Sequence, residues 1–366
     1  MTRPIRAEIS ASALRHNYQF AKRLAPNSKV FAVVKANAYG HGIERVAKAL
    51  LDADAFATLE LDSAEKLRKL GVAQPILMLE GLFAKEEIPV YSQHQLMMVV
   101  HNDLQMEMLA SNRPNIPLSV FLKMNSGMNR LGFAPERYGA QLHKAQAMQQ
   151  KGLIADLVLM THFAGADGAE GIGDPLKRFL DAIYAAKASN LPRSVANSAV
   201  TLRFADAHFN WVRPGIMLYG SSPFAEHSAA GLGLRPVMTL RSEIIGEQTL
   251  QAGDSVGYGG IFTAKRRMRI GIVACGYADG FPRHAPGTFD QGTPIMVGGK
   301  RTRTVGRVSM DMLVADITDM PHVHVGAPVT LWGEGLSADE VAHASGTVAY
   351  ELFCAVNSRV KMVDVD

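Results

Sequence analysis

Lys35 combines a reactive side chain with a position that favours reactivity. It directly follows Val30–Val34, a β-branched apolar run typical of a strand buried in a parallel sheet. A lysine at the end of such a strand is partly desolvated, which lowers its pKa and frees the amine to act as a nucleophile or a base. A lone lysine there would more often be a snorkelling side chain. The small-residue segment Ala36–Gly42 that follows favours the catalytic interpretation.

Three more polar residues lie where predicted strands end. His162 and Ser198 each follow a strand, and Arg213 precedes a Pro-Gly pair at the end of the last one. Alone, His162 would be interpreted as a core histidine and Ser198 as an ordinary N-cap. Carboxyl ends of barrel strands meet at one mouth, where hydroxyls and backbone amides often bind phosphate. We therefore expect these residues to form one site with Lys35.

The elements that must position this site alternate between apolar runs and amphipathic helical patterns. The predicted strands are Ala7–Ile9, Val30–Lys35, Ala55–Leu59, Pro75–Leu79, Ile88–Tyr91, Leu118–Met124, Leu157–Thr161, Ser194–Asn197 and Trp211–Met217. The predicted helices are Ala11–Leu24 with Ser10 as N-cap, Ile43–Leu51, Ser63–Leu70, Pro135–Gln150 and Pro175–Ala188. After the first short strand, eight βα units in about 220 residues favour a (β/α)₈ barrel over an open sheet.

The pattern changes after Gly220. A linker-like segment, Gly231–Pro236, precedes a region of strands joined by Gly-rich turns, as antiparallel sheets need. The strands expected there are Met238–Ile245, Arg269–Ala274, Pro294–Val297, Val308–Asp316 and Val329–Trp332, with helices only at Ser337–Ser345 and Val348–Cys354. The predicted organisation is therefore a TIM-like barrel over residues 1–232 and a mostly β domain over residues 233–366.

Composition and charge narrow the classes of partner. The chain is 48% hydrophobic and 20% charged, which is typical of a globular protein. Lysine and arginine number 38 against 34 acids, for a formal charge of +4, but these residues are spread along the chain. The densest cluster, Lys265–Arg267, precedes a predicted strand and is interpreted as a solvated strand end. No nucleic-acid partner is expected.

The cysteine count and the N-terminal residues indicate a compartment, and the histidine spacing gives no reason to assign a metal. Cys275 and Cys354 cannot form a disulfide framework, which favours a reducing compartment. The first ten residues lack the apolar core of a signal peptide, and no apolar run approaches membrane-spanning length. We therefore expect a cytoplasmic protein with no membrane partner. His322 and His324 have no third ligand placed by spacing, so no metal is assigned.

Six segments resemble the motifs of the alanine racemases, in family order and across essentially the whole chain. They are Val33–Gly42, Lys123–Gly132, Asn197–Ala199, Arg213–Gly220, Gly276–Gly280 and Val305–Asp311. The first is similar to the family's pyridoxal-phosphate lysine signature. The resemblance implies a pyridoxal 5'-phosphate-dependent isomerase that interconverts L-alanine and D-alanine, for peptidoglycan synthesis or for alanine catabolism.

The resemblance also implies roles for individual residues. In the barrel, Lys35 would form the internal aldimine, His162 would lie against the cofactor ring and Arg213 would face the pyridine nitrogen. The phosphate would be held by Tyr39, Ser198, Gly215, Ile216 and Tyr350. Arg130 and the backbone of Met310 would receive the substrate carboxylate. Tyr277 would be a second base, entering from the partner subunit of a homodimer that shares its active sites.

This residue set suits racemisation. Removing the Cα proton on one face and returning one on the other is most simply done by two acid/base groups, here Lys35 and Tyr277. By resemblance, the lysine handles the proton of D-alanine and the tyrosine that of L-alanine. A free tyrosine has a pKa of about 10, so positive charge is expected near it. Arg213 cannot give up a proton, so it would leave the pyridine nitrogen unprotonated and suppress transamination.

Two other classes of pyridoxal-phosphate protein, and a racemase of different specificity, are alternatives to this function. A pyridoxal-phosphate decarboxylase with the same architecture would place an acid where Arg213 lies, and a cofactor-homeostasis protein would lack the β domain with Tyr277 and Tyr350. A racemase for a larger amino acid stays open, because the side-chain pocket is not visible in the sequence. In some relatives the lysine at the position of Lys123 is carbamylated, and an ammonium there would repel Arg130.

Overall fold

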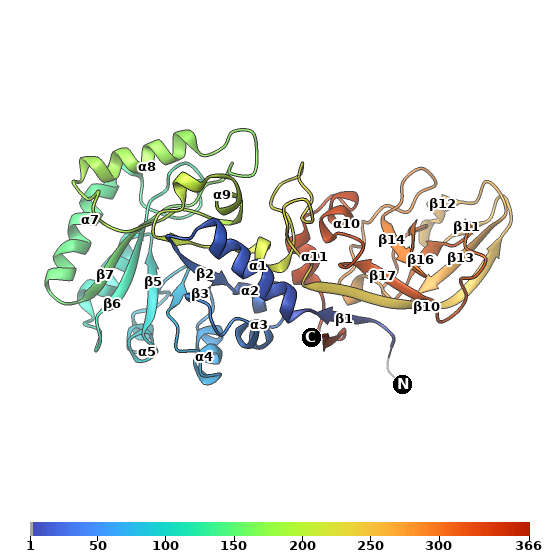
Figure 1. The fold of residues 1–366 in the computed structure, drawn as a ribbon, viewed down its shortest axis with the longest axis horizontal. Coiled ribbons are helices and arrows are strands. Elements are labelled where there is room, and N and C mark those ends of the chain that lie inside the picture. The colour runs from blue at the N-terminus through green and yellow to red at the C-terminus, as the bar shows by residue number, and fades with distance from the viewer. Residues whose placement is uncertain (1–2) are drawn as a thin grey trace.

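The computed structural model describes residues 3–366, which form an elongated molecule with a barrel at one end and a strand-rich body at the other (Figure 1). The barrel is an eight-stranded parallel sheet in the order β8-β7-β6-β5-β4-β3-β2-β9. Its strands are β2 (Lys29–Val33), β3 (Ala55–Thr58), β4 (Ile76–Met78), β5 (Leu96–Val100), β6 (Leu118–Lys123), β7 (Ile154–Met160), β8 (Arg193–Ser194) and β9 (Trp211–Val212). A parallel bridge between Ala196 and Val212 brings the two ends of the sheet together. The barrel and the β-rich second region confirm the expected fold class.

Helices surround the barrel strands. They are α1 (Ala11–Leu24), α3 (Ile43–Ala49), α4 (Leu61–Lys69), α5 (Ile88–Gln93), α6 (Asp103–Ser111), α7 (Pro135–Gln150), α8 (Gly173–Ala185) and α9 (Ser198–Arg203). Local signals set several of their ends: Ser10 accepts the Ala13 N–H as N-cap of α1, and Pro135 begins α7. No helix among residues 3–366 is both long and apolar enough to cross a membrane.

One predicted strand is wrong. Residues Ile88–Tyr91 lie in helix α5, and the fourth barrel strand is β5, over Leu96–Val100. Pro89 explains the error, because it fits the first turn of a helix but removes a donor that a sheet needs. The apolar run that begins at Leu96 supplies the buried strand instead.

The second sheet follows the order β15-β14-β17-β10-β1-β18, with β13 on β10 and β16 on β13. Its strands are β1 (Arg6–Ile9), β10 (Met238–Leu250), β13 (Met268–Val273), β14 (Pro294–Val297), β15 (Lys300–Arg303), β16 (Leu313–Asp316), β17 (Pro328–Trp332) and β18 (Lys361–Asp364), and β11 (Ser255–Val256) and β12 (Phe262–Thr263) form a separate hairpin. The expected N-terminal strand therefore forms, but it lies in this sheet, antiparallel to β10 and parallel to β18. The division at residues 232 and 233 stays a prediction.

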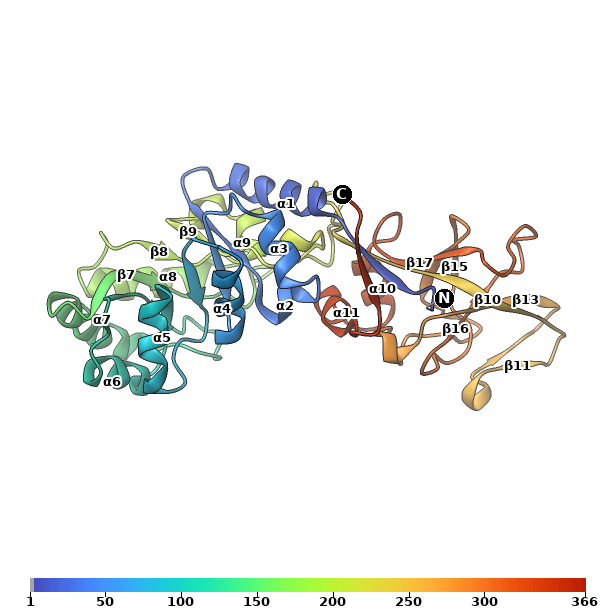
Figure 2. The same ribbon diagram turned by 90° about the horizontal axis from the view of Figure 1, so that it is seen from below.

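Helices α10 (Ala338–Ala344) and α11 (Ala349–Ala355) lie between the barrel and the second sheet. Figure 2 shows β1 running from the second sheet to α1, with the C-terminus close to the start of that helix. Asp366 accepts hydrogen bonds from the Ser12 backbone and from the Ser10 hydroxyl, which ties the end of the chain to α1. The barrel mouth is thus bordered by elements from both regions.

Candidate active site

A cavity of about 900 Å³ opens at the carboxyl ends of the barrel strands. Nine of the eleven residues predicted from the sequence line it: Lys35, Tyr39, Arg130, His162, Ser198, Arg213, Gly215, Ile216 and Tyr350. The barrel supplies all of them except Tyr350, which comes from α11. The structure therefore brings together side chains from segments that lie far apart in the sequence.

Lys35 begins α2 (Lys35–Tyr39), a single turn of left-handed helix. Ala36, Asn37 and Ala38 have φ of 52°, 52° and 56°, a conformation that costs roughly 1–2 kcal/mol per residue. The Asn37 side chain accepts the Ile43 N–H at 2.9 Å, which fixes the turn against α3. Backbone strain of this kind is concentrated at functional sites. The sequence predicted a small-residue loop here but not its handedness.

Positive charge is concentrated in the cavity wall. Burial lowers the pKa of Lys35, and the neighbouring Arg130 guanidinium lowers it further. Burial also lowers the pKa of Lys123 to about 8, with contributions from Arg213 and Arg130. Glu80 opposes both shifts from the same cavity. The ion pairs among residues 3–366 include none of these cations, so the cavity favours an anionic ligand.

Arg213 is fully enclosed and held at two points. Its guanidinium donates to the Ser194 hydroxyl at 2.5 Å and to the Thr161 carbonyl at 2.9 Å. Burial lowers its pKa to about 9, which leaves the side chain charged at neutral pH. These two contacts fix the plane of the guanidinium in the cavity wall, so it is a preorganised donor.

His162 lines the cavity beside these cations but is itself uncharged. Burial holds its pKa well below the usual range, and the Arg213 charge lowers it further. Its Nε2 lies 3.5 Å from the amide nitrogen of Asn197. The imidazole is therefore uncharged at neutral pH, and it lines the cavity.

Ser198, Gly215 and Tyr39 form a second, donor-rich end of the cavity. The Ser198 hydroxyl accepts the Gly215 N–H at 2.9 Å, joining the start of α9 to η3 (Ile216–Tyr219). A Cβ on Gly215 would lie 2.5 Å from the Tyr39 hydroxyl, so a larger residue there would have to displace the Tyr39 ring. The Ile216 N–H donates to no backbone carbonyl within residues 3–366. Tyr350 adds a hydroxyl, its ring 6.0 Å from that of Tyr39.

Tyr277 and Met310 are the two predicted residues that lie outside this cavity. They are neighbours on the second region: the Tyr277 N–H donates to the Ser309 carbonyl at 3.1 Å, and the Ala278 N–H donates to that of Met310 at 3.0 Å. Both are exposed, Tyr277 at 38% and Met310 at 53%. The Arg283 guanidinium lies 5.4 Å from the centre of the Tyr277 ring. Within one chain, Tyr277 and Met310 therefore lie next to each other but do not line the cavity that contains Lys35.

Sequence reasoning missed other lining residues. Glu80 follows β4, Asn197 caps α9, and Asp339 at the start of α10 accepts the Ser222 N–H at 3.0 Å. Glu80 lies at a strand end, the signal that identified Lys35, and could have been found in the same way. Asp339 carried no such signal, because it depends on packing between the two regions.

A (β/α)₈ barrel with a half-buried lysine and a cluster of cations at its mouth, followed by a β domain, defines a barrel enzyme for small anionic ligands. The family models for the alanine racemase N-terminal domain and C-terminal domain match residues 9–223 and 237–364. The chain belongs to the alanine racemase family.

Individual relatives agree along the full length. The catabolic alanine racemase of Klebsiella aerogenes is 51% identical over 99% of this chain and 99% of its own, and an alanine racemase of Cupriavidus necator is 52% identical over 98% and 95%. The crystal structure of the biosynthetic alanine racemase from Pseudomonas aeruginosa superimposes with a TM-score of 0.94 at 46% identity, covering all of both chains.

Proposed function

We propose that this protein interconverts L-alanine and D-alanine with pyridoxal 5'-phosphate, in active sites shared between the two subunits of a homodimer. The observation that carries the proposal is one cavity that holds both the half-buried Lys35, whose pKa is lowered, and the fixed guanidinium of Arg213. A pyridoxal-phosphate decarboxylase would be expected to place an acid at that position.

The residues present fit the cofactor. A neutral Lys35 amine can react with its aldehyde, and the lowered pKa of Lys35 increases the neutral fraction. The Tyr39 and Tyr350 hydroxyls and the free Ile216 N–H suit a phosphate group. The uncharged His162 ring suits packing against an aromatic face. When bound, pyridoxal phosphate supplies an electron-withdrawing ring that acidifies the Cα–H of an attached amino acid.

The chain's own groups then bind the substrate and move protons. The Lys35 amine takes the Cα proton from D-alanine on one face, and the Tyr277 hydroxyl gives one to the opposite face; for L-alanine the two roles are reversed. Arg130 pairs with the substrate carboxylate. The Met310 N–H donates to no backbone carbonyl within residues 3–366 and is proposed as a second donor to that carboxylate.

The shared site follows from the position of Tyr277. A proton acceptor must lie within hydrogen-bond reach of the atom it serves, and Tyr277 does not line the cavity of its own chain. It is exposed beside Met310 on the second region. We propose that a second copy of the chain brings this pair to the cavity. The domain division at residues 232 and 233 would then separate a cofactor-binding barrel from a β-rich domain that serves the partner's barrel.

The setting proposed is the cytoplasm, with D-alanine supplied for peptidoglycan or alanine consumed as a nutrient. Relatives with either role are known by name, one catabolic and one biosynthetic. Both roles use the same chemistry, so the cavity described here is compatible with each.

The test is to incubate the purified protein separately with L-alanine, L-serine and L-lysine and to measure D-enantiomers by chiral chromatography. We expect D-alanine as the main product. A protein that shows the absorbance of lysine-bound pyridoxal phosphate but forms no D-alanine would contradict the proposal. Lys35→Ala is expected to lose that absorbance, whereas Tyr277→Phe should keep it and lose racemisation.

A further inference from the structure

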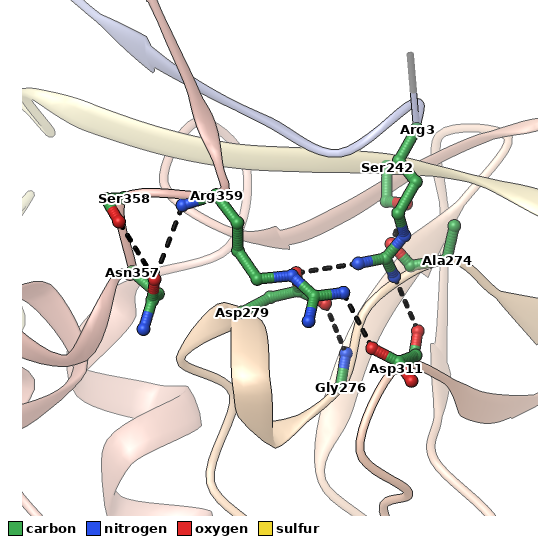
Figure 3. A network of polar contacts seen from close by, with 9 residues as sticks. All are labelled: Arg3, Ser242, Ala274, Gly276, Asp279, Asp311, Asn357, Ser358 and Arg359. Atoms are coloured by element: carbon green, nitrogen blue, oxygen red, sulfur yellow. Dashed lines mark hydrogen bonds and ion pairs between the residues drawn. The ribbon is translucent and has the colours of Figure 1, made fainter.

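Asp279 is a fully buried carboxylate two residues after Tyr277, in the same short turn, η5 (Tyr277–Asp279). One oxygen pairs with Arg3 at 2.8 Å and with Arg359 at 2.9 Å, and the other accepts the Gly276 N–H at 2.9 Å. Figure 3 shows the two guanidiniums converging on this carboxylate from the two ends of the chain. A buried charge with two cationic partners and a backbone donor is held in a single position.

The same two arginines also hold the segment that carries Met310. Arg359 donates to the carboxylate of Asp311 at 2.6 Å, and Arg3 donates to its main-chain carbonyl at 2.6 Å. Asp311 directly follows Met310, so the contacts drawn in Figure 3 connect the Tyr277 turn to the Met310 segment. The group Arg3, Asp279, Asp311 and Arg359 is called the Asp279 network below.

Backbone packing makes the connection stiff. A Cβ on Gly276 would lie 2.3 Å from the Met310 carbonyl oxygen, and one on Gly280 would lie 2.5 Å from that of Ala355. The Asn357 N–H donates to the Asp279 carbonyl at 3.2 Å. With so little space on either side, a shift of Asp279 must move the turn or the Met310 segment.

We propose that Asp279 is a positioning residue for the proton transfer at Tyr277. Through the Asp279 network it sets the Tyr277 hydroxyl and the Met310 N–H at a fixed relative position, so that one chain presents both to the cavity of its partner as a unit. The inference rests on the proposed function, because it takes Tyr277 as the base that serves L-alanine. Asp279 touches no reacting atom.

The first test is the Asp279→Asn variant, which keeps the size of the side chain but removes its charge. Displacement of a catalytic group by about 1 Å can cost roughly 10²-fold in rate, and we expect kcat to fall by that order with little change in bound pyridoxal phosphate. The Tyr277 step then limits the rate. The deuterium isotope effect with Cα-deuterated L-alanine should rise, and that with Cα-deuterated D-alanine should fall towards unity.

A matched control separates positioning from general loss of stability. Glu247 on β10 pairs with Arg269 on the neighbouring strand β13 at 2.6 Å. Glu247→Gln should lower stability without changing either isotope effect. Arg359→Lys, a milder change that keeps the charge but loses the forked contact, should repeat the Asp279→Asn pattern in weaker form. It keeps the proposal testable if Asp279→Asn does not fold. Isotope effects that stay unchanged or rise equally for both enantiomers would overturn it.

Mixed dimers test which cavity Asp279 serves. Subunits with Lys35→Ala and Asp279→Asn, co-expressed with different tags and purified through both, hold one barrel with Lys35 that receives Tyr277 from a chain with an intact Asp279. We expect that site to be fully active. The Lys35→Ala and Tyr277→Phe pair is the control for site sharing. If the control pair is active and the Asp279→Asn pair is not, the inference fails alone; if neither is active, site sharing and the inference both fail.

Discussion

The cavity brings three cationic side chains together with the Lys35 amine, which must be uncharged to react. Lys123, Arg130 and the fixed Arg213 line the same cavity as Lys35, and burial is the main cause of the lowered pKa values of the two lysines. Arg130 contributes to both shifts. Its charge helps to keep the Lys35 amine uncharged, and under the proposed function it would also attract the substrate carboxylate.

Replacing Arg130 by Met removes a neighbouring positive charge and should raise the pKa of Lys35. Since only the neutral amine reacts with an aldehyde, loading of the apoprotein with pyridoxal phosphate should become slower by roughly two- to tenfold below that pKa. The pH profile of loading should move to higher pH. Stopped-flow absorbance measures the rate. Arg137→Met, which breaks an exposed pair with Asp103 on the outer surface, should leave the profile in place; an equal shift in both variants would contradict the explanation.

Replacing Arg213 by Glu exchanges a guanidinium that stays protonated at neutral pH for an acid that can share a proton with the pyridine nitrogen. The ring should then withdraw electrons more strongly, and amino transfer should compete with racemisation. We expect racemisation to fall by roughly 10²-fold and pyruvate formation from alanine to rise. The ratio of pyruvate to D-alanine measures this, and an unchanged product spectrum would refute the role assigned to Arg213.

At the scale of elements, the left-handed turn α2 is the least expected feature of the barrel mouth. Gly40 ends it with φ of 78°, and a Cβ there would lie 2.0 Å from the Phe353 carbonyl oxygen in α11. The turn thus places Tyr39 in the cavity and allows α11 to approach the barrel. Strain in α2 is offset by this packing and by the Asn37 bond to α3.

Gly40→Ala should be destabilising for two reasons, the positive φ and the collision with α11. We expect the free energy of unfolding to fall by roughly 2–4 kcal/mol, with weaker retention of pyridoxal phosphate. Urea unfolding measures the first and equilibrium dialysis the second. Gly71→Ala is the matched control, because Gly71 has φ of 85° but open space around it. It should cost only about 1 kcal/mol, and equal losses in the two variants would argue against the packing contribution.

At the scale of the whole molecule, the second region has two separate parts, one that lines the cavity of its own chain and one that lies outside that cavity. Within one chain, α10 and α11 complete the cavity wall, and Asp339 holds α10 to the barrel through Ser222. Tyr277 and Met310, in contrast, do not line that cavity. The segments that carry them are held together by Arg3 and Arg359. Under the proposed function, one chain builds the cavity that would hold the cofactor, and a partner chain would supply the second base.

Dilution should separate these two functions. Below the concentration at which dimers dissociate, we expect racemisation per subunit to fall while the absorbance of lysine-bound pyridoxal phosphate persists. Sedimentation velocity gives the fraction of dimer at each concentration, and activity should follow that fraction. Activity per subunit that stays constant in a sample shown to be monomeric would contradict the shared site.

Several elements were predictable from local patterns. Helix α7 begins and ends at the predicted residues, Pro135 and Gln150, because a proline at its first position and a periodic apolar face define it. Strand β14 was also placed correctly. The prediction at Ile88–Tyr91 is wrong, because a short apolar run fits a helix as well as a strand and Pro89 decides between them.

The sequence by itself determined the class of fold and that Lys35, His162, Ser198 and Arg213 share the barrel mouth, because strand ends in a parallel barrel converge whatever the details of packing. Only the tertiary structure decided the left-handed turn after Lys35, the place of β1 in the second sheet, and the network around Asp279. Each of these depends on contacts between distant segments: α2 on α11, β1 on β10, and Arg3 and Arg359 on one carboxylate. The spacing of residues along the chain does not predict such contacts, because they form only when distant segments come together in the folded protein.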